Sequence, residues 1–538
     1  MAFKEIFTDS TIALYAKQIR AAPRPLIFNK KLLLSALCYA TSSLPLGTSR
    51  HPLPIPDLPG FQGHFGFSNS SAGQLRYFVS IPFASAGVGA LLSWFLNDRI
   101  GRLWSWRLYT VIWMIGQLVM CFTPTLTGLW VARVICGLGI GPLSVVGNMA
   151  IVEIAPTEIR GLLSVWYSVF MVIASVCAVF SVMGCYIHIV PSRLQYQVVW
   201  FSPCVFFALL IAGSFYVCES PRWLWMVDRH DEAVKTLVEI RGLPAEHPRV
   251  KFEIEEIKMA IAKEKRDHSS TSSLFISNVK ETFTVRSNLR RVQQTFASFA
   301  LAQISGANSI TSYLIPILKL LGQAGDTTHG LFLSGMYSTS KIFFTLIACF
   351  FLVDSIGRRR CLMLGACLQM CSDIYLGVYL KYEQAGSTST ASSQGALAFM
   401  FIHALGYAIG LYMLPYLFGG EVWPNRIRSF GGAISQCFHW LFFFAMLFAL
   451  PSLLDATNNW GAFLFFAGCC FLAQVYVFFM VPETSGLSVE ELDEVFEGPW
   501  LSAYRYSRKR NQLVIEAADL EIQNDKIVGM KSGEKLVV

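Results

Sequence analysis

The sequence predicts an all-α polytopic membrane protein: twelve transmembrane helices in two six-helix bundles, joined by a cytoplasmic helical linker. The first observation is composition, since 54% of the 538 residues are hydrophobic and only 14% are charged, whereas soluble domains carry about 25% charge. The second is a series of apolar runs of about 20 residues, the length that crosses a bilayer as a helix. The third is a duplication of charged motifs, which indicates two equivalent halves.

Two charged motifs occur twice, in the same order. The sequence DRIGR at 98–102 returns as DSIGR at 354–358, 256 residues later. The sequence EIAPTEIR at 153–160 is answered by EVWPNRIR at 421–428, 268 residues later. Each copy directly follows an apolar run, so we interpret the motifs as equivalent turns of two repeated units.

The apolar runs divide the chain into five predicted parts. These are a cytoplasmic arm at 1–30, a first bundle at 31–218, a linker at 219–291, a second bundle at 292–481 and a cytoplasmic tail at 482–538. The expected spans of the first bundle are 31–49, 74–97, 108–122, 129–152, 162–190 and 198–218. Those of the second are 293–321, 329–353, 361–380, 396–419, 430–454 and 460–481.

The segments between the spans are polar, and their composition interrupts the helices. The loop at 50–71 is rich in proline, which interrupts helices, and the turn at 98–107 is strongly basic. Within the linker, 231–241 and 250–265 have helical periodicity and many charges, so we expect two amphipathic helices on the cytoplasmic face. The Ser/Thr stretch at 269–273 is typical of a flexible connection.

Basic residues set the expected orientation. They concentrate in the linker and in the turns that follow the second, fourth, eighth and tenth spans, and they are sparse in the opposite loops. By the positive-inside rule these turns and both termini face the cytoplasm. The N-terminal arm lacks the pattern of a cleaved signal peptide. We expect an integral multi-pass protein of the plasma membrane.

Other function classes are disfavoured by the same features. The net charge of +8 comes from helix ends and loops, which does not suggest nucleic-acid binding. The cysteines lie mostly inside apolar segments without a C-x-x-C and histidine pattern, so no metal or cofactor is expected. No catalytic triad, metal cluster or phosphate-binding loop is recognisable, which argues against an enzyme.

The duplicated charges are predicted to form a cytoplasmic gate. Carboxylates and arginines meet where adjacent helices reach the membrane surface, so ion pairs between the bundles would close this side in one state and open in the other. A partly buried ion pair has little net stability after desolvation, which suits an element that opens in every cycle. The alternative is that these charges only set topology. The predicted gate residues are Asp98, Arg102, Glu153, Arg160, Asp354, Arg358, Glu421 and Arg428.

Further motifs accompany this pair. They are RVICGLGIG at 133–141, ESPRWL at 219–224, QISGAN at 303–308 and PETSG at 482–486. As an ordered set over about residues 31–490, they resemble the sugar porter family of the major facilitator superfamily, in a fungal form. The resemblance implies alternating access by rocking of two six-helix bundles, with the solute bound near the midplane.

Polar side chains in the middle of a span are costly and therefore suggest a solute pathway. Gln303, Ser305, Asn308 and Ser312 surround Gly306 in the seventh span, and amides both donate and accept hydrogen bonds, as hydroxylated solutes require. The resemblance implies that Gln303 and Asn308 bind sugar hydroxyls. The alternative is that they join helices to one another.

The resemblance implies three further solute residues. Trp440 falls where the family places a stacking aromatic side chain, and Tyr416 stands where a tryptophan is common. Ser168, with Tyr167, occupies the region of a fifth-span glutamine. Core packing is the alternative for each.

The chain also departs from the family pattern. Ala302 replaces the first of two glutamines, and Trp94 stands before the first motif where a glycine is usual. These changes leave the predicted solute site with fewer groups that can hydrogen-bond solute hydroxyls and with a more apolar lining. They favour a cyclic acid or a secondary metabolite over a hexose as the solute.

Coupling to protons is the remaining question. Proton-linked family members carry a first-span aspartate beside the fourth-span arginine, and here Arg133 is present while 31–56 contains no acidic residue. This absence slightly favours facilitated uniport. Asp373 and His439 are the other candidate coupling groups, and Lys341 either faces a cavity or reaches the membrane surface.

The predicted function is transport of a sugar or similar small hydroxylated solute by alternating access. A proton-coupled carrier of an organic acid or secondary metabolite is the first alternative, and a nutrient sensor that does not transport is the second. The expected partners are the solute (a sugar, polyol or organic acid), the lipid bilayer and, in the coupled alternative, protons.

Overall fold

The computed structural model describes most of the chain as helices. The described residues are 24–49, 55–56, 58–66, 72–156, 159–266, 279–323, 325–352, 357–412, 415–416, 422–424, 427–483, 495–498 and 500–501. Within these ranges there is no β-strand. Seven helices are long and apolar enough to cross a membrane. They are α7 (Ala72–Ile100), α9 (Leu126–Ile154), α10 (Arg160–His188), α11 (Leu194–Gly213), α21 (Arg358–Gln384), α24 (Arg428–Ala456) and α25 (Trp460–Met480).

The remaining expected spans are shorter, less apolar or interrupted. Three are single helices, α8 (Arg102–Phe122), α19 (Thr327–Ile347, followed by a π-helical turn at Ala348–Leu352) and α22 (Thr390–Ile409). The first span consists of α4 (Lys30–Ala40), a 3₁₀ turn (Thr41–Ser43) and α5 (Leu44–Ser49). The seventh consists of α16 (Arg286–Ile304), α17 (Ala307–Ser312) and α18 (Leu314–Leu320). The predicted all-α fold of two six-helix bundles is confirmed.

The interruption of the first span follows from its sequence. The hydroxyl groups of Thr41, Ser42 and Ser43 donate to the carbonyl oxygens of Cys38, Tyr39 and Ala40, three residues earlier in each case. Such bonds let hydroxyl side chains compete with the backbone ladder of an α-helix. The helix is therefore tightened into a 3₁₀ turn at this point.

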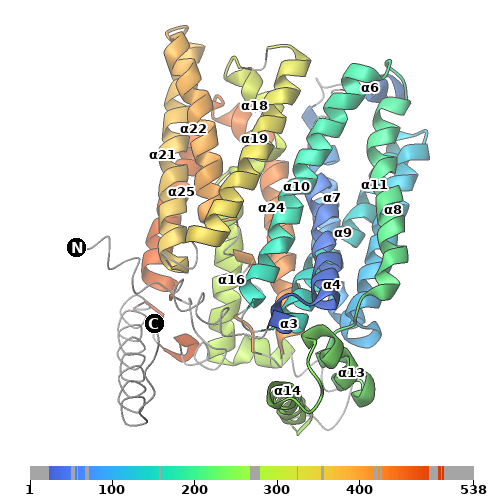
Figure 1. The fold of residues 1–538 in the computed structure, drawn as a ribbon. Coiled ribbons are helices and arrows are strands. Elements are labelled where there is room, and N and C mark those ends of the chain that lie inside the picture. The colour runs from blue at the N-terminus through green and yellow to red at the C-terminus, as the bar shows by residue number, and fades with distance from the viewer. Residues whose placement is uncertain are drawn as a thin grey trace, which may run out of the picture.

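Packing within each half is extensive, and several helix pairs join the halves (Figure 1). In the first half α9 packs against α7 and α8, and in the second α21 packs against α22 and α25. Between the halves, α7 lies along α24, α10 lies along α19, and α9 also contacts α24. A rocking motion of the halves would have to change these interhelical contacts.

The linker gathers at one end of the molecule, which we call the linker end (bottom of Figure 1). It contains α12 (Pro221–Met226), α13 (His230–Arg241) and α14 (Pro248–Arg266), so helices occur where the two amphipathic helices were expected. Arg241 holds the linker on the bundle, because it donates to the carbonyl oxygen of Ile154 at 2.7 Å and pairs with Glu253 at 2.5 Å. At the opposite end, the loop expected at 50–71 contains a short helix, α6 (Pro59–Phe65).

Candidate solute-binding site

The seventh span breaks at Gly306, and the break turns its polar side chains toward one another. Gly306 has φ +81°, and a Cβ at this position would lie 2.5 Å from the ring of Phe466. Only glycine accepts both conditions without strain. Across the break, the Nδ2 of Asn308 donates to the Oε1 of Gln303 at 2.8 Å.

His439 on α24 connects this amide pair to the tenth span. Its Nδ1 lies 3.1 Å from the Nε2 of Gln303, and its Nε2 lies 2.8 Å from the hydroxyl of Tyr416. All of these side chains are buried. We call Gln303, Asn308, Tyr416 and His439 the polar cluster. It contributes amide, imidazole and phenol groups, which both donate and accept hydrogen bonds.

Aromatic side chains wall the polar cluster from both halves. The ring of Phe299 lies 5.1 Å from that of His439, and the ring of Trp440 lies 4.7 Å from it. Phe83 of α7 stacks on Trp440 at 5.7 Å with an interplanar angle of 5°. The indole Nε1 of Trp440 donates to the hydroxyl of Ser144 on α9 at 3.0 Å, which crosses between the halves. The cluster therefore lies at the junction of the two bundles.

A crevice leads from the linker end to this junction. Its lining comes from both halves and includes Ser144, Asn148 and Glu153 of α9 and Arg428 and Gln436 of α24. Gln436 is one turn from Trp440, and its buried Oε1 accepts no hydrogen bond from any residue that the structure describes. It is thus a candidate solute residue that sequence reasoning missed, although a mid-span glutamine was the available signal.

The structure brings four predicted solute residues together: Gln303, Asn308, Tyr416 and Trp440. The others lie at the edges. Ser305 accepts a bond of 3.4 Å from the Nε2 of Gln369, and Ser312 is buried on α17. Ser168 is buried on α10, and its backbone carbonyl accepts from the hydroxyl of Tyr412 at 3.4 Å, again across the halves.

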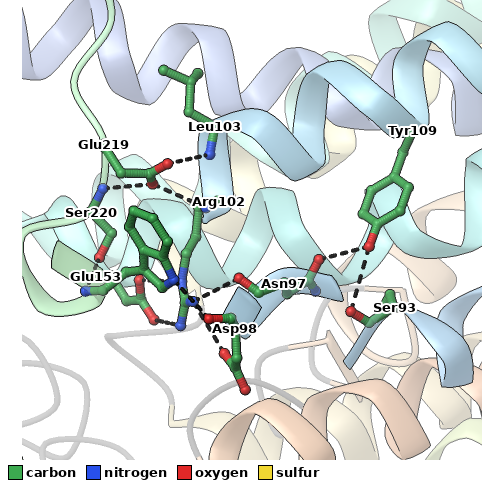
Figure 2. A network of polar contacts seen from close by, with 10 residues as sticks. Ser93, Asn97, Asp98, Arg102, Leu103, Tyr109, Glu153, Glu219 and Ser220 are labelled. Carbon is green, nitrogen blue, oxygen red and sulfur yellow. Dashed lines mark hydrogen bonds and ion pairs between the residues drawn. The ribbon is translucent and has the colours of Figure 1, made fainter. Parts of the chain in front are cut away.

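Arg102 forms the centre of the predicted gate motif (Figure 2). It pairs with Glu153 through two hydrogen bonds of 2.9 Å and with Asp98 at 3.1 Å. The same guanidinium donates to the carbonyl oxygen of Asn97 at 3.0 Å. The side chains of Arg102 and Glu153 are 2% and 6% exposed, so this is a buried, multiply bonded pair.

Glu219 completes the network by capping α8. Its carboxylate accepts from the backbone N–H groups of Arg102 and Leu103, each at 3.0 Å. Gly101, at φ +93°, lets the chain turn into the helix there. Burial raises the pKa of the Glu219 carboxyl, since desolvation outweighs the backbone donors that favour its charged form.

The second half repeats this cap. Glu483 accepts from the backbone N–H groups of Arg358 and Arg359 at 2.9 and 3.2 Å. Gly357 again has φ +93°. The ESPRWL and PETSG motifs thus supply equivalent N-terminal caps, a role that the sequence did not reveal.

The structure describes fewer contacts for the remaining predicted gate residues. Asp354 and Glu421 lie outside the described residues. Arg160 begins α10, and Arg428 donates to the carbonyl oxygen of Trp423 at 3.3 Å. The hydrogen bonds of Arg102 stay within the first half, whereas the prediction was of pairs between the halves. A guanidinium with this many partners inside its own bundle has little capacity left for another.

Trp94 makes a contact between the halves at the linker end. Its ring lies 4.8 Å from that of Phe430 on α24, within a cluster that includes Trp423 and Ile427. The residue that departs from the family pattern therefore contributes an apolar contact at the predicted gate.

The candidate coupling residues have distinct environments. Arg133 is buried and donates to the carbonyl oxygen of Phe78 at 3.0 and 2.5 Å. His439 belongs to the polar cluster. Asp373 is paired with His403, whose Nε2 lies 3.5 Å from its Oδ1. The sequence analysis did not identify His403, although its position could have indicated it. Asp373 lies 11 residues before the end of α21, and His403 lies 13 residues after the start of α22. The two residues therefore lie at similar depth in one helical hairpin.

The chain is similar to known membrane carriers in sequence and in fold. The chain is 29% identical over 490 residues to a probable quinate permease of Aspergillus fumigatus, covering 89% of each chain. It is 27% identical over 462 residues to the quinate permease of Neurospora terricola, covering 82% and 84%. The structure of the proton:xylose symporter XylE, bound to 6-bromo-6-deoxy-D-glucose, matches 87% of this chain and 99% of its own with 21% identity and a TM-score of 0.72, which establishes the shared fold.

The family described as "Sugar (and other) transporter" matches residues 55–496, which is most of the chain. Both of these relatives are fungal permeases, and the fold is that of the major facilitator superfamily. This protein therefore belongs to the sugar (and other) transporter family and is an integral membrane transporter of small solutes.

Proposed function

We propose that the protein carries a small cyclic hydroxylated solute, with a quinate-like organic acid as the first candidate, by alternating access. The observation that carries this proposal is the polar cluster at the broken seventh span. Gln303, Asn308 and Tyr416 present amide and phenol groups, while Phe299 and Trp440 supply flat apolar surfaces. Hydroxyls on a ring match the first set and the faces of the ring match the second.

Lys341 supports an acid in preference to a neutral sugar. It donates to the hydroxyl of Thr311, which lies one turn beyond Asn308 on α17. Its ammonium also lies 4.8 Å from the ring centre of Tyr337 and 5.7 Å from that of Tyr407. Positive charge therefore stands beside the helix that carries the candidate solute residues, where it would attract a carboxylate. The relatives include fungal proteins named as quinate permeases or probable quinate permeases, which supports this choice.

A neutral sugar is the second candidate. The side chains of Gln303, Asn308 and Tyr416 carry no charge at neutral pH, and amides and phenols suit sugar hydroxyls equally well. On this reading Lys341 contributes only to the packing of α17 against α19.

We also propose that the linker end faces the cytoplasm of the cell, with the protein in the plasma membrane. The basic side chains of the duplicated motifs and of the linker gather at this end, as the positive-inside rule requires. Cysteine substitutions placed at Arg229 and at Ser387, at opposite ends of the bundle, test it with a membrane-impermeant thiol reagent on intact cells. Labelling is expected only at position 387, and labelling only at position 229 would reverse the orientation.

Uptake into proteoliposomes tests the solute site. Labelled quinate and xylose would be offered separately to the purified protein and to Gln303→Ala and Asn308→Ala. Each substitution removes a hydrogen-bonding group that faces the solute, so each is expected to lower quinate uptake at least tenfold, by the roughly 1.5 kcal/mol or more that such a bond contributes to a charged or closely fitted ligand. Gln195→Ala is the control, because this buried glutamine bonds the carbonyl oxygen of Ile189 at the other end of the bundle.

The outcomes separate the candidate functions. Loss of uptake in the two site variants, with the control unchanged, supports the assignment. Uptake of xylose and not of quinate favours the sugar. Unchanged kinetics in both site variants would remove the polar cluster from the pathway, and binding without flux in the unmodified protein would identify a sensor.

A further inference from the structure

A buried acid–base pair lies beside the solute site, in the second half. Asp373 of α21 and His403 of α22 are each 0% exposed, and the carboxylate and imidazole approach to 3.5 Å. Neither carboxylate oxygen, nor the Nδ1 of His403, has a hydrogen-bond partner among the residues that the structure describes. Unsatisfied buried groups of this kind are costly, and ionisable residues inside a membrane-spanning segment are candidates for a functional site.

The pair is linked to the seventh-span break by neutral side chains. The Nε2 of Gln369, one turn before Asp373, lies 3.4 Å from the Nε2 of His403 and 3.4 Å from the hydroxyl of Ser305. Ser305 directly precedes Gly306, at which the helix turns between Gln303 and Asn308. A change in the charge of the pair therefore has a short bonded route to the solute residues.

Other titratable groups face the pair from two helices, α19 and α25. Cys469 and Cys470 of α25 lie near Asp373, and so does Tyr337 of α19. Lys341, also of α19, is close enough to His403 to interact with it electrostatically. Thiols and phenols are neutral at physiological pH, so the charge that faces the pair is that of Lys341.

We propose that Asp373 and His403 form a proton-binding site that couples solute transport to proton movement. With one proton the pair is neutral overall, either as carboxylic acid and imidazole or as carboxylate and imidazolium. When it loses that proton it carries one negative charge, which Lys341 balances. The same proton enters from one side of the membrane and leaves on the other, and only O–H or N–H bonds form and break.

Lys341 determines that the solute and the proton move in the same direction. This part of the proposal rests on the proposed function, in which the solute is an acid. An anionic solute beside Thr311 engages the charge of Lys341, which then no longer balances a deprotonated pair. A net negative charge at this depth is expensive, so the pair takes up a proton when the anion binds. Solute anion and proton are therefore carried together, and because both groups are buried in this conformation the proton is held without a leak.

Counterflow and gradient-driven uptake in proteoliposomes test the coupling. With an outside that is one pH unit more acidic, the unmodified protein is expected to accumulate labelled quinate about tenfold, the ratio equivalent to one proton per solute. Asp373→Asn and His403→Gln are expected to abolish accumulation while retaining exchange of quinate across the membrane. The control is Asp326→Asn, since Asp326 caps α19 and asparagine caps equally well. Accumulation by Asp373→Asn equal to that of the unmodified protein would overturn the proposal.

If neither quinate nor xylose is transported, that result counts against the proposed function and not against the proton-binding site. A measurement without solute then tests the proton-binding site by itself. Infrared difference spectra between acidic and alkaline buffer report protonated carboxyl and imidazolium groups. The pair titrates as a unit, so Asp373→Asn and His403→Gln are each expected to remove the same band. Spectra of both variants that overlay the unmodified spectrum would show that the pair binds no proton in this range.

Discussion

Arg102 shows how one side chain organises the linker end. It is 2% exposed and bonds Glu153, Asp98 and the carbonyl oxygen of Asn97. Removing one member of such a buried pair leaves an uncompensated charge, which costs far more than the pair itself contributes. The network is therefore expected to be sensitive to single substitutions even though its net contribution to stability is small.

Glu153→Ala tests this expectation. It would leave the Arg102 guanidinium buried without its bidentate partner, so the free energy of unfolding is expected to fall by about 3–5 kcal/mol. Thermal unfolding of the purified protein in detergent measures the effect. Glu232→Ala removes a carboxylate from an ion pair whose side chains are 49% and 56% exposed, and its melting temperature is expected to stay nearly unchanged. Equal melting temperatures for the two variants would contradict the account of the network.

Individual residues show what the sequence can and cannot predict. Gln303 and Asn308 were predicted because polar groups in an apolar span are rare and both fall in one short motif. The role of His439 as the bridge between Gln303 and Tyr416 was not predicted, because 136 and 23 residues of sequence separate these contacts. The pairing of Asp373 with His403 was missed as well, although equal depth in a hairpin would have revealed it.

At the scale of the element, the broken seventh span determines where the polar side chains meet. Discontinuous helices are the usual solute sites of such carriers, because the break frees polar groups to face a cavity. A glycine in mid-span permits a break in the helix, and Gly306 adopts a φ of +81° at that point. Its contact with Phe466 of α25 was unpredictable, since it depends on the packing of helices distant in sequence.

Gly306→Ala is expected to destabilise the protein and to abolish transport. An L-residue in this left-handed conformation costs about 1–2 kcal/mol, and the added Cβ would also collide with Phe466 at 2.5 Å. Gly468→Ala on α25 is the matched control. Apart from the backbone of its own helix, no atom of the described residues lies within 4 Å of the place that its added methyl group would take, and alanine favours helices. Melting temperature and quinate exchange measure both variants, and full activity of Gly306→Ala would contradict the role of the break.

A substitution of Trp94 tests whether the contact between α7 and α24 keeps the linker end closed. Trp94→Gly removes the contact with Phe430, so the linker end is expected to open more often. Labelling of an Asn148→Cys substitution in the crevice, quantified at that peptide by mass spectrometry, is then expected to be faster in the Trp94→Gly background. An unchanged rate would mean that this tryptophan only fills space.

At the scale of the whole molecule, duplication provides two similar halves. Glu219 and Glu483 cap equivalent helices in the same way, and Gly101 and Gly357 share the same φ of +93°. The spans and the two-bundle fold were predictable from hydropathy and from the repeated motifs. The substrate chemistry was not, because it depends on contacts between helices that are distant in sequence, such as those of His439 with Gln303 and Tyr416.

The central claim is that the polar cluster binds the hydroxyl groups of the solute through hydrogen bonds. Exchange of labelled quinate in proteoliposomes, competed by unlabelled quinate or by cyclohexanecarboxylate, tests it most directly. A buried site built for hydroxyls rejects an analogue that lacks them, by as much as about 10⁴-fold. We therefore expect quinate to compete and cyclohexanecarboxylate, which has the ring and the carboxylate without the hydroxyls, to fail. Equal competition by the two would contradict the account.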